Sequence, residues 1–213
     1  MRLLASISFA CVLLSACSAE QTSTPEIQKG NQLSTADTVS GNQNTSNLPV
    51  DSSTIQSRPD VDELLESFTY CRDNSENSLT CKYFIAKAIC QFYGIEDFKG
   101  SDGEYIDFEE ILPEVKASNL WERAGDANDQ LALDKAQKAA NNGKAALAIS
   151  EGDKYGHVVM ILPGTQEMAP SWGNLNCPKV ASFFMVPDLE PFVERSLAFA
   201  WSTPVGIGIY IRK

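Results

Sequence analysis

The spacing of apolar residues changes along the chain and predicts helices first and strands later. Between residues 59 and 143 the apolar positions recur every three or four residues, which is the period of an amphipathic helix. After residue 144 the pattern becomes short apolar runs separated by Gly, Pro, Asn and Asp, which is typical of β-strands. Helices are predicted over residues 59–70, 80–94, 107–124 (interrupted or divided at Pro113) and 128–143. Strands are predicted over residues 145–150, 157–163, 180–186 and 205–213, and residues 195–202 remain ambiguous.

The order of these elements predicts an α+β fold. No helix intervenes between the first two strands, so these strands should pair antiparallel rather than through a helical crossover. We therefore expect N-terminal helices packed on an antiparallel sheet. Residues 59–213 have the length of one ordinary domain.

The N-terminus lacks this pattern and looks like an export signal. Arg2 precedes an apolar stretch over residues 3–14, and the run Leu14-Ser15-Ala16-Cys17 follows it. That run resembles a bacterial lipobox, which implies a signal peptide of residues 1–16, cleavage before Cys17 and acylation of Cys17. The resemblance predicts a lipid-anchored protein of the cell envelope, on the periplasmic face of the outer membrane if the organism is Gram-negative.

The segment after Cys17 is predicted to be a tether. Residues 18–58 are dominated by Ser, Thr, Asn and Gln and contain no aromatic residue. Such a segment cannot bury enough apolar surface to offset the entropy of ordering its chain. As a flexible coil it would span on the order of 35 Å. The predicted tether would place the domain near the membrane surface.

The charge of the chain excludes one class of partner. The formal net charge is −11, from 28 acidic and 17 basic residues. Nucleic acids require a basic surface to neutralise their phosphates, so we do not expect nucleic acid binding.

Four cysteines of the predicted domain allow two interpretations. An exported chain with Cys71, Cys81, Cys90 and Cys177 could hold two disulfides, in any of three pairings. Alternatively, Cys81 could be a free nucleophile. Its position near the start of a predicted helix would favour the thiolate, and nearby backbone N–H groups could stabilise an oxyanion. His157 is the only histidine and could act as the base. The spacing alone does not decide between these interpretations.

Several motifs resemble one group of enzymes. The helix-initial Cys81 and the strand-initial run "GHVVMILPG", with "ALDKAQKAANNGKAALAI" before it, are similar to the NlpC/P60 and CHAP group of papain-like cysteine amidases and peptidases. This resemblance implies a papain-like fold with Cys81 as nucleophile and His157 as base. The third catalytic position does not carry over cleanly: Asn174 is our first candidate, with Asn176 and Ser182 as alternatives.

The resemblance implies an amidase or endopeptidase that cleaves amide bonds in peptidoglycan stem peptides. Tyr70, Trp121 and Trp172 could then line a substrate cleft. No cofactor is implied, and one histidine with scattered cysteines gives no metal-site spacing. Two alternatives stay open: a non-catalytic binding module of the same fold that holds cell-wall peptide or a protein partner, and an envelope immunity or assembly lipoprotein with structural cysteines.

The thiol state of Cys81 separates these hypotheses. If Cys81 is the nucleophile, it should be reduced, and at most one disulfide should form among the other three cysteines. A Cys71–Cys177 bond is the pairing that we favour, since it would close a long loop. A disulfide that contains Cys81 would contradict the enzyme hypothesis.

Overall fold

The structure is a computed structural model that describes residues 58–75, 78–152, 156–186 and 188–213. The predicted signal peptide, Cys17 and residues 18–57 of the predicted tether lie outside these residues, so those predictions remain predictions. The described residues fall within one structural unit, which spans Ser52–Lys213.

Helices and strands both occur in this part of the chain, with most helices first. The helices are α1 Val61–Asn74, α2 Phe84–Tyr93, α3 Phe108–Ala117 and α4 Gln130–Asn141, and the 3₁₀ turns are η1 Ser78–Cys81, η2 Pro170–Trp172 and η3 Leu197–Phe199. The strands are β1 Trp121–Asp126, β2 Ala146–Ser150, β3 Val158–Ile161, β4 Glu167–Ala169, β5 Leu175–Cys177, β6 Lys179–Ser182, β7 Phe192–Ser196 and β8 Ile207–Arg212. The α+β class is confirmed.

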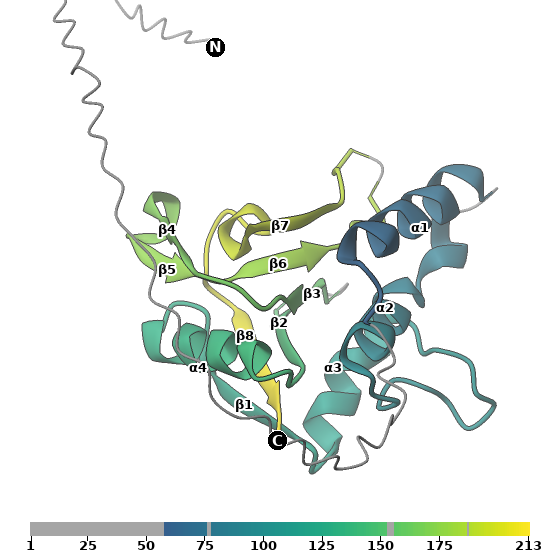
Figure 1. Ribbon diagram of the computed structural model, residues 1–213, viewed down its shortest axis with the longest axis horizontal. Helices are drawn as coiled ribbons and strands as arrows, with labels where there is room; N and C mark the ends of the chain where they lie inside the picture. The colour runs from purple at the N-terminus through teal and green to yellow at the C-terminus, as the bar shows by residue number, and fades with distance from the viewer. Residues whose placement is uncertain (1–57, 76–77, 153–155, 187) are drawn as a thin grey trace, which may run out of the picture. The chain divides into compact units, whose positions relative to one another are not determined.

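Six strands form one sheet in the order β1-β8-β2-β3-β6-β7, and every neighbouring pair is antiparallel. Strands β4 and β5 form a separate hairpin. Helices α1, α2 and α3 lie together on one side of the sheet and α4 lies on the other (Figure 1). The sheet is therefore covered on both faces.

This layering explains why the central strands are continuous apolar runs. Successive side chains of a strand point to opposite faces of the sheet. Leu147 and Ile149 of β2 pack in the core beneath α1–α3, while Ala146 and Ala148 pack in the core beneath α4. Both sets must be apolar, so β2 shows no polar alternation.

Acidic residues cap the starts of three of the helices. The Asp60 side chain accepts a hydrogen bond from the Asp62 N–H at the start of α1, and Asp129 accepts one from the Leu131 N–H at the start of α4. Asp107 and Glu110 form a capping box at the start of α3. Each cap satisfies backbone N–H groups that have no partner within the helix.

The prediction of helix over residues 113–124 is wrong in its second half. Helix α3 continues through Pro113 to Ala117, and the chain then forms the edge strand β1, which pairs with β8. Strand β1 contains an irregularity between Arg123 and Gly125, and its polar residues are exposed. Such an edge strand gives no alternating pattern by which it could be recognised.

The structure also assigns the segment that the sequence left ambiguous. Residues 195–202, which the sequence left ambiguous, contain the end of β7 followed by the turn η3. Among the helices of the described ranges, none is long and apolar enough to span a bilayer.

Candidate functional site

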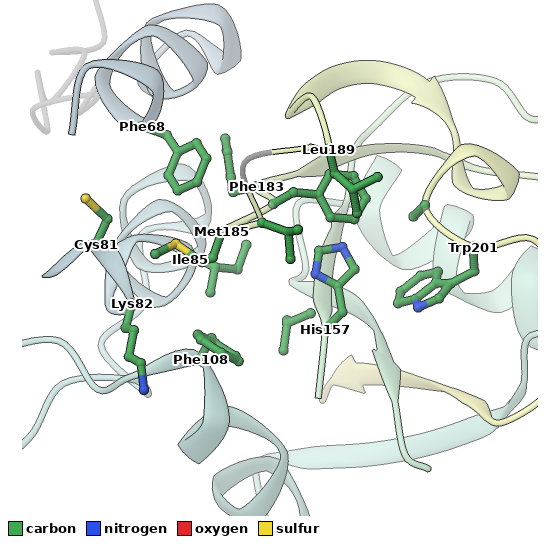
Figure 2. Close-up of a pocket in the computed structure, with 14 residues that line it drawn as sticks. Phe68, Cys81, Lys82, Ile85, Phe108, His157, Phe183, Met185, Leu189 and Trp201 are labelled. Atoms are coloured by element: carbon green, nitrogen blue, oxygen red, sulfur yellow. The ribbon is translucent and has the colours of Figure 1, made fainter. Parts of the chain in front are cut away.

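An apolar cavity of about 510 Å³ lies where the α1–α3 layer meets one end of the sheet (Figure 2). Both Cys81 and His157 contribute to its wall, although 75 residues of sequence separate them. The remaining lining residues come from α1, the link between η1 and α2, α2, α3, the start of β3 and the segments after β6 and η3: Phe68, Lys82, Ile85, Phe108, Val158, Phe183, Phe184, Met185, Val186, Leu189, Ala200 and Trp201. The volume falls within the range of small-molecule sites in proteins.

Cys81 forms a disulfide with Cys71, and the two Cα atoms are 6.2 Å apart. The prediction of a reduced Cys81 is therefore wrong for this structure, and so is the favoured Cys71–Cys177 pairing. Cys90 and Cys177 are both free and buried. Because a disulfide sulfur is not a thiolate, Cys81 cannot act as a nucleophile in this form.

Cys81 does not lie in the first turn of a helix, contrary to the prediction. Residues 78–81 form the 3₁₀ turn η1, and α2 begins only at Phe84, with Tyr83 as its N-cap. Cys81 thus precedes the first turn of α2, where the helix dipole and free N–H groups would act on a thiol. Cys81 still packs in the core with Ile85 and is only 1% exposed.

His157 lies immediately before β3 and is held by three contacts. Its Nε2 atom is 2.9 Å from Ser182 Oγ on the neighbouring strand β6. Its ring stacks on Phe184, with a centroid distance of 4.4 Å, and meets the edge of Trp201 at 5.2 Å. This burial lowers the pKa of His157 from 6.5 to about 4. The imidazole is consequently neutral at physiological pH.

Cys81 and His157 approach the cavity from different parts of the core. Cys81 belongs to the apolar cluster beneath α1–α3, whereas Phe184 and Trp201, the ring partners of His157, pack against the cluster beneath α4. In the view of Figure 2, Ile85 and Met185 lie between the two side chains, and the Cys81 sulfur is directed away from His157. The described form does not contain an assembled Cys–His pair.

The third predicted residue, Asn174, is not brought to this site. It follows η2 with a φ of 66°, and its N–H donates to the Ala169 carbonyl within the β4–β5 hairpin. Asn176, in the same hairpin, pairs through its backbone with the Gln130 side chain. Of the three candidates, only Ser182 contacts His157 in the described structure.

The predicted cleft residues Tyr70, Trp121 and Trp172 do not line the cavity. Tyr70 is 72% exposed on α1. Trp121 and Trp172 are buried in the core, where their indole N–H groups donate to Asp97 and to the Trp201 carbonyl. Sequence reasoning missed the aromatic residues that do line the cavity, although the Phe183-Phe184 pair within the strand predicted over residues 180–186 was a usable signal.

The cavity carries little net charge. Among the described residues that line the cavity, Lys82 is the one with a permanent charge, and its ammonium lies 3.2 Å from the Glu109 carboxylate. His157 is neutral, as described above. Across the described ranges, no group of three or more His, Cys, Asp or Glu residues could hold a metal ion.

No family model and no curated protein sequence matches this chain. The likeness to papain-like amidases therefore remains a resemblance of short motifs.

Proposed function

We propose that this protein, in the disulfide form described, binds an apolar side chain of a cell-envelope peptide or protein without cleaving it. The observation that carries the proposal is the Cys71–Cys81 bond in the wall of a cavity whose described lining is mostly apolar. A cavity of this size can hold a ligand group, but Cys81, the one cysteine among its described lining residues, has no free thiol for catalysis.

The charges around the cavity support an uncharged ligand group. His157 is neutral, and Glu109 offsets the charge of Lys82. A charged group that entered the cavity would lose its hydration without gaining an opposite charge. An apolar group would instead gain about 25 cal/mol for each Å² removed from water.

The proposal includes a papain-like architecture on a lipid anchor. Three features support that architecture: a cysteine just before α2, a histidine at the start of β3, and a serine on the neighbouring strand that contacts the histidine. The Cys17 lipobox and the predicted tether would place the domain beside the membrane, where envelope peptides and proteins are accessible.

The second candidate is a cysteine amidase or endopeptidase that acts on peptidoglycan stem peptides. One observation favours it: Cys81 and His157 line the same cavity, and Ser182 could orient the imidazole. The Cys71–Cys81 disulfide contradicts this hypothesis for the oxidised protein, so the hypothesis applies only to a reduced form in which Cys81 turns toward His157. Cys81 would then attack the amide carbonyl while the histidine accepts the thiol proton and returns it to the leaving amine.

A dye titration tests the binding hypothesis. The chain from residue 18 onward, exported through a cleavable secretion signal and kept oxidised, should bind the neutral apolar dye N-phenyl-1-naphthylamine. Leu189 lies at the cavity and is 46% exposed. Leu189→Ser removes apolar contact area and should weaken dye binding by about tenfold.

Val205→Ser is the matched control, because Val205 is 71% exposed and does not line the cavity. Its dye affinity should equal that of the unaltered chain. Equal affinities for all three proteins, or no binding at all, would contradict the proposed site. Synthetic peptides with Leu or Phe should compete with the dye, while peptides with Asp or Lys in their place should not.

Digestion of purified peptidoglycan separates the two candidates. The oxidised protein should release no fragments, as judged by mass spectrometry. Release by the oxidised protein would refute the binding-only proposal. Release only after reduction, and its loss in His157→Ala, would support the amidase hypothesis.

The anchor is tested separately. In a bacterial host, the full chain should incorporate an alkyne-labelled fatty acid, and Cys17→Ser should remove that label completely because the thiol is the acylated group. Cys11→Ser is the matched control in the signal region and should keep the label. Equal labelling of the Cys17→Ser chain would show that the lipobox prediction is wrong.

A further inference from the structure

The Cys71–Cys81 disulfide lies where it can control the cavity as well as the fold. It joins α1 to η1, and both elements supply lining residues, Phe68 and Cys81. Arg72 follows Cys71 and donates from its guanidinium to the carbonyl of Leu189, at a distance of 3.3 Å. The bond therefore holds one wall of the cavity and, through Arg72, a part of its rim.

The other cysteines in the described ranges have no such position. Neither Cys90 nor Cys177 lines this cavity, and burial raises the pKa of both thiols. They provide internal references for a buried, unreactive thiol.

We propose that the Cys71–Cys81 disulfide is a redox latch on the cavity, opened by a dithiol reductant of the envelope. This inference rests on the cavity of the proposed function and adds its regulation. Opening the latch places a free thiol in the cavity wall and removes the covalent tie between α1 and η1.

The dithiol reductant supplies the two electrons that reduce the Cys71–Cys81 disulfide. Its thiolate attacks the sulfur of Cys71 rather than that of Cys81, because Cys71 as a residue is partly exposed whereas Cys81 is only 1% exposed. The S–S bond breaks, a mixed disulfide forms at Cys71, and the Cys81 thiolate leaves and takes a proton. The second thiol of the reductant then attacks the mixed disulfide and releases the Cys71 thiol, so the reductant becomes a disulfide.

The freed Cys81 thiol has a direct path into the cavity. The disulfide holds its sulfur on the α1 side, away from His157 (Figure 2). Rotation about the Cα–Cβ bond, which the disulfide prevents, would turn the sulfur toward the apolar lining. A neutral thiol behaves as a small hydrophobic group, so that lining can accommodate it.

Alkylation with N-(1-pyrenyl)maleimide tests the latch, with mass spectrometry to locate each adduct. In the oxidised protein Cys81 should not react. After reduction, and without reduction in Cys71→Ser, Cys81 should react at least tenfold faster than Cys90 and Cys177. If Cys81 reacts only at the rate of these two buried thiols, the disulfide has a structural role alone, and the proposal is overturned. Free thiols at both Cys71 and Cys81 in protein isolated without reductant would overturn it as well.

Dye binding distinguishes failure of the latch proposal from failure of the proposed binding function. Fast alkylation of Cys81 without dye binding would retain the latch and refute the binding site. Dye binding with slow alkylation would retain the binding site and refute the latch. Circular dichroism of the reduced protein and of Cys71→Ser must match the oxidised spectrum. If Cys71→Ser unfolds, the reduced unaltered chain decides the result, and if that also unfolds on reduction, the latch is refuted.

Discussion

Phe68→Ala should lower the free energy of unfolding by about 3–5 kcal/mol, the usual cost of removing a large aromatic side chain from a core. Phe68 is fully buried on α1, and its ring contacts those of Phe84 and Phe183 at centroid distances of 5.2 and 5.3 Å. These contacts attach α1 both to α2 and to the segment after β6. The truncation removes these contacts and leaves an unfilled space beside the cavity that Phe68 lines.

Urea denaturation of the oxidised protein measures this effect. Val205→Ala is the control, since the side chain is 71% exposed, and it should change the unfolding free energy by no more than about 0.5 kcal/mol. A loss of less than about 1 kcal/mol in Phe68→Ala would show that the aromatic cluster does not hold α1 on the sheet. Phe68→Leu should recover much of the loss, because it restores apolar volume.

The second large effect is a loss of stability in mild acid. The pKa of His157 is about 4 in the folded protein and 6.5 when the residue is unperturbed. Between these values the unfolded chain binds a proton that the folded chain does not, so stability falls as the pH falls through this window. Above pH 7 both states are neutral at this residue and contribute no pH dependence. The full shift corresponds to about 3 kcal/mol, and we expect about 2–3 kcal/mol because water in the cavity can partly solvate the charged ring.

The comparison with His157→Gln isolates this contribution from that of the carboxylates, which the two proteins share. The difference in unfolding free energy between them should be constant above pH 7. It should shift in favour of the glutamine variant as the pH is lowered from 6.5 to 4. A difference that stays constant across this range would mean that His157 titrates normally in the folded protein, and would remove the argument for an uncharged cavity.

The sequence predicted the regular elements where local pattern and tertiary environment agree. Helix α1 and helix α4 combine an acidic cap with an apolar face, and β2, β3 and β8 are apolar because they are buried on both sides. Strand β1 was missed because an edge strand with exposed charged residues takes its conformation from pairing with β8, about 85 residues later. Pairing over such a distance leaves no local pattern.

The candidate site was less predictable than the fold. Motif order singled out Cys81 and His157, and the structure does place both at one cavity. The pairing of Cys81 depends on which cysteine lies within disulfide distance, and spacing cannot decide that. Ser182 rather than Asn174 contacts His157 because β6 lies beside β3, whereas Asn174 lies in the separate hairpin.

The position of β8 between β1 and β2 determines the order in which this domain can assemble. Residues 207–212 are the last strand along the described chain, yet they pair with both β1 and β2. Until these residues are available, β1 has no partner strand within the described part of the chain, and one edge of β2 remains open. Contacts this distant in sequence form slowly, because a long loop must close before any pairing energy is gained. A chain that becomes available from its N-terminus onward, as it does during synthesis, therefore cannot complete this sheet until residues 207–212 have been added.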